Sequence, residues 1–464
     1  MSASAGLEQT APPAAPVGGV ASFARALSFG DLPFDVARQG ERCLLDLIGV
    51  AAAGARTPSA RIVDDYVASE MRASASEARL LFDGRRASRA GAALAGASTI
   101  DALDAHDGHV LTKGHAGVAV LPALLAVVDA GAHCSGEEFL SGLVLGYEIG
   151  TRAGIALHAT VPDYHCSGAW NSLACAALAG RLLRLDEARL REALGIAEYF
   201  GPRGQILRVC AHPSMLKDGS GWGAHCGVTA ALLAADGFTG APALTVERDD
   251  AAEFWTDLGA RWRIREQYFK AYPVCRWAQP AIEAALSLKR AHRFEAADVV
   301  RIEVASFREA IDLGSQCPSP ATTDEAQYSL PYGVAAALLF GRVGAAEVDL
   351  DAVRDSRLAG LLGRIVLRED AGFSRRFPAE RWARVSIALA DGRTLASAPE
   401  RARGNPENPL TDDELTSKYR ELATPVLGAG RAARIEALVA SLAADRTALP
   451  ALLDELFAPL TPVR

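Results

Sequence analysis

The first 267 residues repeat apolar side chains at helical spacing, and this pattern constrains the fold more than any other feature of the chain. In residues 36–50 apolar residues recur three and four positions apart, as on the buried face of an amphipathic helix. Residues 51–55, AAAGA, are small enough for helix backbones to approach closely. Similar Ala- and Leu-rich runs occupy residues 59–71, 88–102, 118–128, 136–157, 170–182 and 186–200. We therefore expect residues 19–267 to form a tightly packed helical domain.

A different pattern begins near residue 268. Residues 299–305 and 382–389 alternate apolar and polar side chains, as half-buried strands do. Asp391-Gly392 then separates the second run from another short extended run, which is a hairpin signal. Helical runs at 276–291, 330–341 and 351–363 lie between these strands. This part predicts a smaller α/β unit at residues 268–404.

The chain becomes helical again near its end. Residues 411–414, TDDE, have the acidic first turn of a helix, because carboxylates are favourable at a helix N-terminus. We expect residues 405–464 to return to the first domain. The predicted fold is therefore mainly α, with a large all-helical domain built from both chain ends and a smaller inserted α/β lid domain.

Charge and cysteine usage exclude several classes of function. The net charge of −8 argues against nucleic acid as the main partner, since phosphate binding needs a basic surface. No charge-free apolar run of about 18 residues occurs, so no membrane span is expected. The eight cysteines form no CxxC pair, which disfavours structural zinc and suits a reducing compartment. Residues 1–18 resemble a disordered tail rather than a secretory signal. We expect a soluble, cytoplasmic protein.

The stretch from Asp101 to Leu125 carries the strongest functional signal. Its first fifteen residues contain seven ionisable side chains, and an apolar helical run follows directly: Asp101, Asp104, His106, Asp107, His109, Lys113 and His115. A carboxylate can orient an imidazole and raise its basicity, so Asp104 with His115 is the sharpest acid–base pair. For either residue alone, a helix-capping Asp or a surface His is the alternative. We interpret the stretch as one wall of an active site whose glycines let the backbone bend.

Metal and cofactor binding have weaker support from the same residues. Asp104, His106, Asp107 and His109 have spacings at which a divalent ion can be chelated. Such short spacings in a loop broken by glycine are not diagnostic, so we predict no metal. No glycine fingerprint of a dinucleotide site follows a predicted strand. The expected cofactor is therefore none.

Three further segments carry candidate binding groups. Lys217 precedes a Gly-rich turn that opens an apolar helix, a place suited to a substrate carboxylate, although a solvated lysine is the alternative. Lys270, Cys275 and Arg276 lie at the junction of the two predicted domains, where clefts tend to form. Nothing marks a base for Cys275, which favours a buried thiol over a nucleophile. His165 precedes a helix and in isolation would be a neighbour of its cap.

These segments together resemble the MmgE/PrpD family, which includes 2-methylcitrate dehydratase, cis-aconitate decarboxylase and iminodisuccinate epimerase. The resemblance covers almost the whole chain, and each piece is short but agrees in order and spacing. The pieces are Leu45–Val50 with Ala53-Gly54, Ala102–His115 with Leu121-Pro122, Gly146–Glu148, His165, Lys217 with Gly221–Ala224, Gly237–Gly240, Lys270–Cys275 and Ser329–Tyr332.

The resemblance implies a fold and a set of active-site positions. It implies the same helical domain and inserted lid, a homodimer, and action without cofactor on small di- and tricarboxylates. The implied catalytic positions are Asp104, His115, His165, Lys217, Lys270 and Tyr332. On this basis Lys217 and Lys270 hold substrate carboxylates, His115 moves a proton with support from Asp104, and His165 and Tyr332 bond substrate or a leaving hydroxyl.

The chain departs from the family pattern at positions that bear on substrate. Cis-aconitate decarboxylase has a histidine where this chain has Cys275, and many members read Asp-Phe-Asp-Asp where it reads Asp104-Ala105-His106-Asp107. We assign substrate binding to the nonstandard or adjacent groups His106, His109, Lys113, Cys275 and Arg276. The expected function is a lyase that dehydrates a citrate-like acid by proton abstraction α to a carboxylate. An epimerase or decarboxylase on the same site, and a non-catalytic protein that binds a carboxylate metabolite, are the alternatives.

Overall fold

Helices form where apolar residues recur at helical spacing, and the computed structural model, which describes residues 19–461, is mainly helical as predicted. The predicted tail at residues 1–18 lies outside the described residues. The helices before residue 268 are α1 (Gly19–Ala26), α2 (Phe34–Gly54), α3 (Pro58–Glu70), α4 (Arg89–Asp101), α5 (Gly117–Asp129), α6 (Gly136–Thr160), α7 (Gly168–Leu182), α8 (Glu187–Phe200), α9 (Leu207–Ala211), α10 (Ser220–Ala235) and α11 (Leu244–Glu247). Short 3₁₀ turns occupy Phe29–Asp31, Asp249–Phe254 and Arg263–Glu266.

The centre of the helical part is the apolar helix α5. Its residues 117–128 are all buried, and α5 packs against α4, α6, α7 and α10. Small side chains make this close packing possible: a Cβ at Gly146 of α6 would lie 2.3 Å from a methyl of Val120. Because α5 begins directly after the predicted active-site stretch, a rigid helix holds the end of that stretch.

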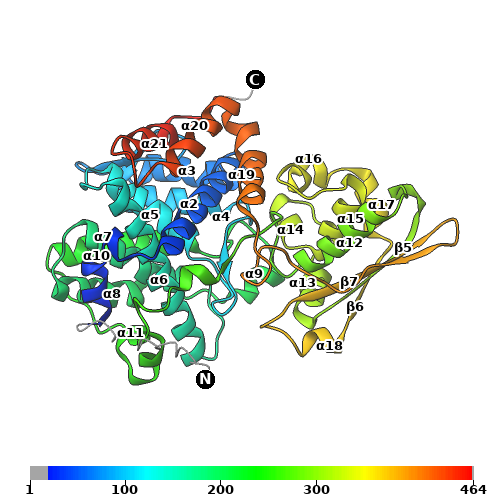
Figure 1. The fold of residues 1–464 in the computed structure, drawn as a ribbon, viewed down its shortest axis with the longest axis horizontal. Helices are drawn as coiled ribbons and strands as arrows, with labels where there is room; N and C mark the ends of the chain where they lie inside the picture. The colour runs from blue at the N-terminus through cyan, green and yellow to red at the C-terminus, as the bar shows by residue number, and fades with distance from the viewer. Residues whose placement is uncertain (1–18, 462–464) are drawn as a thin grey trace, which may run out of the picture.

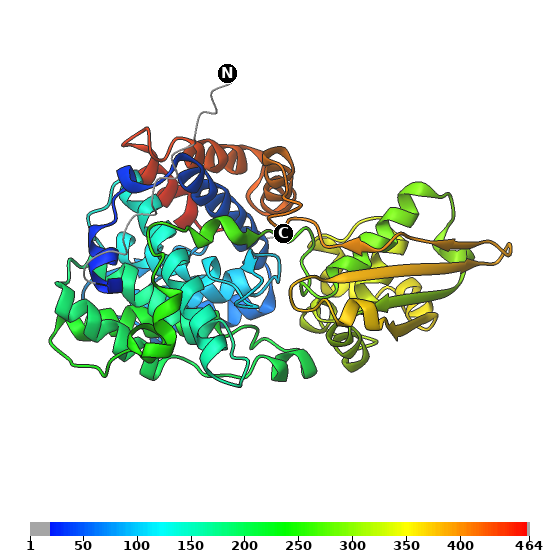
Figure 2. The same cartoon turned by 60° about the horizontal axis from the view of Figure 1, so that its bottom comes forward.

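Residues 268–404, which we call the lid segment, contain the main sheet. Its elements are α12 (Gln279–Ala291), β5 (Val299–Ser306), α13 (Arg308–Gln316), α14 (Thr323–Gln327), α15 (Leu330–Phe340), α16 (Leu350–Val353), α17 (Ser356–Leu362), β6 (Ile365–Glu369), α18 (Ala371–Ser374), β7 (Trp382–Leu389), β8 (Thr394–Ala396) and β9 (Glu400–Arg401), with 3₁₀ turns at Ala296–Asp298 and Ala346–Val348. Figures 1 and 2 show this segment on one side of the helical part, and α12 packs against the sheet. The domain boundaries at residues 268 and 404 stay predictions.

The sheet has the strand order β6-β5-β7-β8, and β9 pairs with the start of β7. β5 runs antiparallel to β7 and parallel to β6. The predicted hairpin at Asp391-Gly392 is confirmed as the turn between β7 and β8, and Gly392 has the positive φ of 88° that favours glycine there. Strand β6 has no counterpart among the predicted strands.

One predicted helix is divided in two. Residues 351–363 form α16 and α17, because the side chain of Asp355 caps a new helix by accepting a hydrogen bond from the backbone N of Arg357. The predicted runs 276–291 and 330–341 correspond to α12 and α15 to within a few residues at each end, whereas α13, α14 and α18 had no predicted counterpart. The lid helices α12 and α15 pack on one another.

The chain end returns to the helical part as α19 (Asp412–Leu427), α20 (Ala429–Ala440) and α21 (Ala448–Phe457). Thr411 and Glu414 form a capping box at the start of α19, as the acidic first turn predicts. α19 packs on α2, and Figure 1 shows these two helices side by side. From α19 the ammonium of Lys418 donates to Asp46 at 2.6 Å and to the carbonyl of Ala105 at 2.7 Å. The C-terminal helices thus support the loop after α4.

Two short strand pairs interrupt the helical part. β1 (Glu77–Arg79) pairs with β2 (Arg86–Ser88), and β3 (Gly108–His109) pairs with β4 (Gln267–Tyr268). The second pair brings the loop between α4 and α5 beside the junction with the lid segment. Over residues 19–461, no helix combines the length and the apolar character that crossing a membrane requires.

Candidate active site

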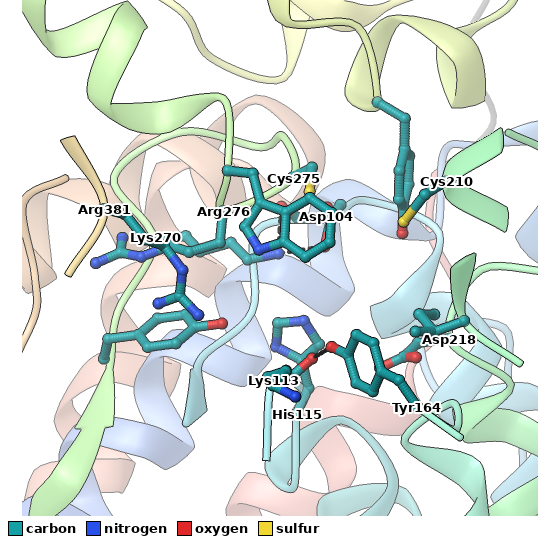
Figure 3. A pocket seen from close by; sticks show the side chains of 14 residues that line it. Asp104, Lys113, His115, Tyr164, Cys210, Asp218, Lys270, Cys275, Arg276 and Arg381 are labelled. Carbon is teal, nitrogen blue, oxygen red and sulfur yellow. Dashed lines mark hydrogen bonds and ion pairs between the residues drawn. The ribbon is translucent and has the colours of Figure 1, made fainter. Parts of the chain in front are cut away.

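A cavity lies where the loop between α4 and α5 meets the lid segment. Its volume is about 50 Å³, room for a few water molecules. Figure 3 shows the side chains that line it, which come from both parts of the molecule: Asp104, Lys113, His115, Tyr164, Ile206, Cys210, Asp218, Tyr268, Lys270, Cys275, Arg276, Trp277, Tyr328 and Arg381. Polar groups from distant segments therefore converge in one small, partly enclosed space, as they do in ligand sites.

Asp104 and Lys270 form a buried ion pair in this cavity. The ammonium of Lys270 contacts Oδ1 of Asp104 and also donates to the Asp104 carbonyl at 3.2 Å. Burial would raise the pKa of Asp104, but the charge and hydrogen bond of Lys270, together with smaller effects of His115 and Lys217, hold that pKa below its ordinary value. The same attraction raises the pKa of Lys270 against the effect of burial. Both side chains are therefore charged at neutral pH.

His115 is held through its backbone and one ring nitrogen. Nδ1 of His115 contacts the carbonyl oxygen of Asp107, which can only accept, so Nδ1 carries the ring proton. Asn171 donates to the His115 carbonyl at 2.8 Å, and the His115 amide donates to Oγ of Ser167 at 2.9 Å. Burial, and then the Lys270 charge, lower the pKa of His115 to about 3. The imidazole is thus neutral, with an unprotonated Nε2.

The predicted support of His115 by Asp104 stays a prediction, because the carboxylate lies near the ring and acts to raise the pKa of His115 but also has a second partner. The sequence pairs Asp104 with His115 as orienter and base, whereas the carboxylate of Asp104 is engaged by Lys270. Backbone contacts also orient His115. Sequence spacing did not reveal Lys270 as a partner of Asp104, because the two residues lie 166 positions apart in the chain.

Asp218 adds an acidic group that sequence reasoning missed. Its carboxyl accepts from the backbone N of Ser167 at 3.0 Å and from the hydroxyl of the same serine. Its amide donates to Asp101 at 3.3 Å. Burial and the neighbouring Asp101 carboxylate raise the pKa of Asp218 to about 8. Asp218 is therefore mostly protonated at neutral pH and faces the same cavity as the unprotonated Nε2 of His115.

Three more cations line the cavity. Arg276 stacks over the ring of Tyr268 at 4.3 Å, donates to the carbonyl of Arg403 at 2.9 Å, and contacts the side chain of Asn405. Burial lowers the pKa of Arg276 to about 10, which still leaves it charged. Lys113 comes from the loop, and Arg381 from the residue before β7. Figure 3 shows Arg381, Arg276 and Lys270 on one side of the cavity, with Asp218 on the other.

The loop glycines serve close packing. Neither Gly108 nor Gly114 has a positive φ. A Cβ at Gly108 would lie 2.6 Å from Nδ1 of His115 and 2.6 Å from the hydroxyl of Tyr268, and one at Gly114 would lie 2.3 Å from Oγ of Ser167. The prediction that these glycines let the backbone bend stays a prediction, since neither needs a left-handed conformation. They make room for the side chains that face the cavity.

Three predicted catalytic residues do not line the cavity. Lys217 is buried and binds the lid segment, with its ammonium 2.8 Å from Asp324 and 2.9 Å from the side-chain oxygen of Gln327. Tyr332 is fully buried in α15 and donates to the carbonyl of Glu347 at 2.7 Å. His165 is half-buried, and its Nδ1 lies 3.3 Å from the carbonyl oxygen of Arg203. Their assigned roles with substrate stay predictions.

Some of the predicted substrate-binding residues line the cavity and others do not. Lys113, Cys275 and Arg276 line the cavity, whereas His106 and His109 lie behind it. Burial, and then the nearby Asp104 carboxylate, raise the pKa of the Cys275 thiol to about 12, so the thiol is protonated and not a nucleophile. His109 is bound to Glu266 at 3.0 Å. The site retains Asp104, His115 and Lys270 from the predicted catalytic set.

His106 is fully buried and packs edge-on against His115, with ring centroids 4.4 Å apart. Ligand atoms of Asp104, His106 and His115 lie within 4.8 Å of one another, a different set from the one that sequence spacing indicates. Lys270 contacts the Asp104 carboxylate of this set, and an ammonium opposes a second cation at that place. Within residues 19–461 these three are the residues that could hold a metal, and a metal would have to displace Lys270.

Four residues of the site had no usable sequence signal. Asp218 stands next to Lys217 in a turn, and Arg381 directly precedes a strand, so neither position suggests a pocket. Tyr164 contacts the Lys113 carbonyl through its hydroxyl. Gln327 accepts from the amide of Asp104 at 2.9 Å as well as from Lys217. Each reaches the site through tertiary packing.

Two family models and several curated proteins match this chain. The MmgE/PrpD N-terminal domain matches residues 19–257, and the MmgE/PrpD C-terminal domain matches residues 272–444. A cis-aconitate decarboxylase-like protein, oryM, of Aspergillus oryzae (strain ATCC 42149 / RIB 40) is 27% identical over 91% of this chain and 94% of its own length. Cis-aconitate decarboxylase of Aspergillus terreus (strain NIH 2624 / FGSC A1156) is 25% identical over 95% of this chain and 96% of its own. 2-Methylcitrate dehydratase of Cupriavidus necator is 26% identical over 48% of this chain and 50% of its own.

Proposed function

Since this chain belongs to the MmgE/PrpD family, we propose that it is a lyase that removes water from a small citrate-like polycarboxylate without a cofactor. The observation that carries the proposal is the pairing of a base and an acid in one cavity. His115 presents an unprotonated Nε2, and Asp218 presents a protonated carboxyl.

Dehydration of such an acid needs both groups. A base must take the proton on the carbon α to a carboxylate, and an acid must protonate the hydroxyl that leaves from the neighbouring carbon. In this proposal His115 is the base and Asp218 is the acid. The carbon–hydrogen and carbon–oxygen bonds break, a carbon–carbon double bond forms, and water leaves.

The charges of the cavity suit the intermediate of this reaction. Proton removal places negative charge on the substrate carboxylate, and a preorganised cation stabilises that charge most in a site shielded from water. Lys270 is fixed by Asp104 within the cavity, next to His115. It therefore supplies the positive charge where the enolate-like anion develops.

Decarboxylation is the second candidate, because two of the relatives that match this chain over nearly its full length are a cis-aconitate decarboxylase and a cis-aconitate decarboxylase-like protein. Loss of carbon dioxide needs no base for a carbon-bound proton, but it needs an acid to protonate the carbanion that remains. Asp218 could provide that proton. The neutral base His115, which decarboxylation leaves unused, favours dehydration.

One experiment separates these reactions. We would incubate the protein with 2-methylcitrate, citrate, cis-aconitate and iminodisuccinate in heavy water and follow each acid by NMR. A dehydratase forms an alkene from a hydroxy acid, and a decarboxylase forms a shorter acid that carries deuterium. An epimerase labels the recovered acid, and a binding protein changes nothing. Loss of turnover in His115→Ala is expected; unchanged turnover in that variant contradicts the proposal.

We also propose a homodimer that uses the surface around α8, α9 and α10. Large apolar side chains are exposed there in one stretch of the chain: Tyr199, Phe200, Leu207, Met215, Leu216 and Trp222. Phe200 and Trp222 line one hollow of about 320 Å³. A group of exposed apolar side chains is typical of an interaction surface. This stretch also supplies Ile206, Cys210 and Asp218 to the cavity, so the contact would stabilise one cavity wall.

A further inference from the structure

Arg381 is a buried cation that lines the cavity without an anionic partner. It is 7% exposed, and its Nε makes no hydrogen bond. Its guanidinium carbon lies 5.8 Å from the centre of the Phe377 ring. No carboxylate within residues 19–461 lies at ion-pair distance from it. A guanidinium buried in this way costs free energy unless a counter-charge arrives from outside the chain.

Lys113 approaches the same region from the helical part. Its ammonium lies 4.9 Å from the centre of the Tyr164 ring. As for Arg381, no carboxylate within residues 19–461 lies at ion-pair distance from it. Burial, and then the positive charge of Arg381, lower the pKa of Lys113. Its φ of 50° lies in the left-handed region, which is unfavourable for lysine. Like charges on the loop and the lid segment therefore face one another across the cavity.

The remaining charges of the cavity do not balance these two. Asp104 is already neutralised by Lys270, and Asp218 is mostly protonated at neutral pH. Arg276 is satisfied by neutral acceptors. Three cationic side chains, Lys113, Arg276 and Arg381, thus lack a counter-charge, so a ligand with three negative charges would neutralise the cavity.

We propose that Arg381 and Lys113 together bind one carboxylate of the substrate, away from the carbon at which His115 acts, and so make the site select acids with three carboxylates over acids with two. This inference rests on the proposed function, because it assumes a polycarboxylate in this cavity. A carboxylate between the two cations replaces their repulsion by two charge-assisted contacts, and an arginine can bind it through both oxygens. Arg381 is thereby a specificity-determining residue that the lid segment contributes.

The test compares two matched acids by calorimetric titration at pH 7.5. Propane-1,2,3-tricarboxylate and pentanedioate share a five-carbon chain, and the second lacks the central carboxylate. The protein should bind the tricarboxylate more tightly. Arg381→Gln should weaken binding of the tricarboxylate by about tenfold to a hundredfold, since one charge-assisted contact is lost. Binding of pentanedioate should change by less than about threefold.

Matched variants separate recognition from general damage to the fold. Arg384→Gln removes the same side chain from an exposed position three residues along β7, and it should alter neither affinity. Lys113→Asn keeps a residue that tolerates a left-handed backbone, and it should reproduce the selective loss. Arg381→Lys, which keeps the charge without the planar fork, should restore part of the affinity. If Arg381→Gln does not fold, Arg381→Lys is compared with the unaltered protein instead.

The inference is overturned if the unaltered protein shows no preference for the tricarboxylate or binds neither acid. It is also overturned if Arg381→Gln weakens both acids equally or leaves both affinities unchanged. Binding of these probes does not depend on turnover, whereas the proposed function fails when no acid of the heavy-water panel is converted. The two failures are therefore distinguishable.

Discussion

Replacing Asp218 by Asn tests whether the acid of the cavity is the one that the structure indicates. The amide has the shape of the carboxyl: its oxygen can still accept from the backbone N of Ser167 and its NH2 can donate to the Ser167 hydroxyl, but it cannot deliver a proton. The variant should therefore fold, retain affinity for substrate, and lose most of its rate. General acid catalysis contributes about 10²- to 10⁴-fold, so kcat should fall by that range while KM changes little.

The pKa of Asp218 also predicts how the reaction rate depends on pH. Burial and the Asp101 carboxylate raise the pKa of Asp218 to about 8, so about nine-tenths of it is protonated at pH 7. Since the proton is lost as pH rises through the pKa, kcat/KM should decrease about tenfold per pH unit above pH 8. His115 has a pKa of about 3 and is unprotonated throughout this range, so no loss of activity is expected between about pH 5 and 7.

The assay is initial-rate turnover of the acid that the protein converts, from pH 5 to pH 10, for the unaltered protein and for two variants. Asp218→Asn should be slow and should lack the decrease near pH 8. Asp163→Asn, in an exposed loop, should match the unaltered protein at every pH. A rate in Asp218→Asn within about threefold of the unaltered protein would show that another group supplies the proton.

Three further predictions concern the support of the site, its charge and the assembly. Lys418→Met should lower the free energy of unfolding by about 3–5 kcal/mol in urea denaturation, because it leaves Asp46 buried without its ion-pair partner; adding Asp46→Asn should recover part of that loss, and no recovery would contradict the ion-pair account. Lys270→Met should reduce turnover by about a hundredfold or more and raise the pKa of Asp104, visible by carboxyl NMR, and an unchanged pKa would refute the pair. Trp222→Glu should shift the protein from dimer to monomer in analytical ultracentrifugation, and an unshifted dimer would place the contact elsewhere.

The periodic spacing of apolar residues in the sequence predicted most of the helices and strands of the fold. The helical runs of the first 267 residues and the strands at 299–305 and 382–389 correspond to elements of the structure, because each has a period that one buried face imposes. Strand β6 escaped prediction, since its short apolar run of Ile365, Val366 and Leu367 lacks alternation. The break between α16 and α17 depends on one capping side chain, Asp355, which a hydrophobic pattern does not register.

The sequence predicted the site residues that lie in one short cluster of ionisable side chains. It did not predict the isolated residues that reach the site through tertiary packing. Asp104, His115 and Lys113 were found because they crowd one short stretch. Asp218 and Arg381 come from segments with no such density, and their significance depends on burial. Burial turns an ordinary aspartate into a protonated acid and an ordinary arginine into an unpaired charge, and a sequence does not show burial of an isolated polar residue.

The contacts of Lys217 argue for a role that differs from the predicted one. Its ammonium binds Asp324 and Gln327 of α14, and Gln327 also accepts from the backbone of Asp104 and donates to the carbonyl of Ala102 at 3.3 Å. Lys217 and Gln327 thus hold the lid segment against the residues that bear the acid and the base. These contacts fix the lid segment relative to the loop that carries Asp104, so they set the shape of the cavity in which substrate is held and converted. Lys217→Met should therefore lower kcat and raise KM together, whereas loss of a simple carboxylate contact made equally in both states would raise KM alone.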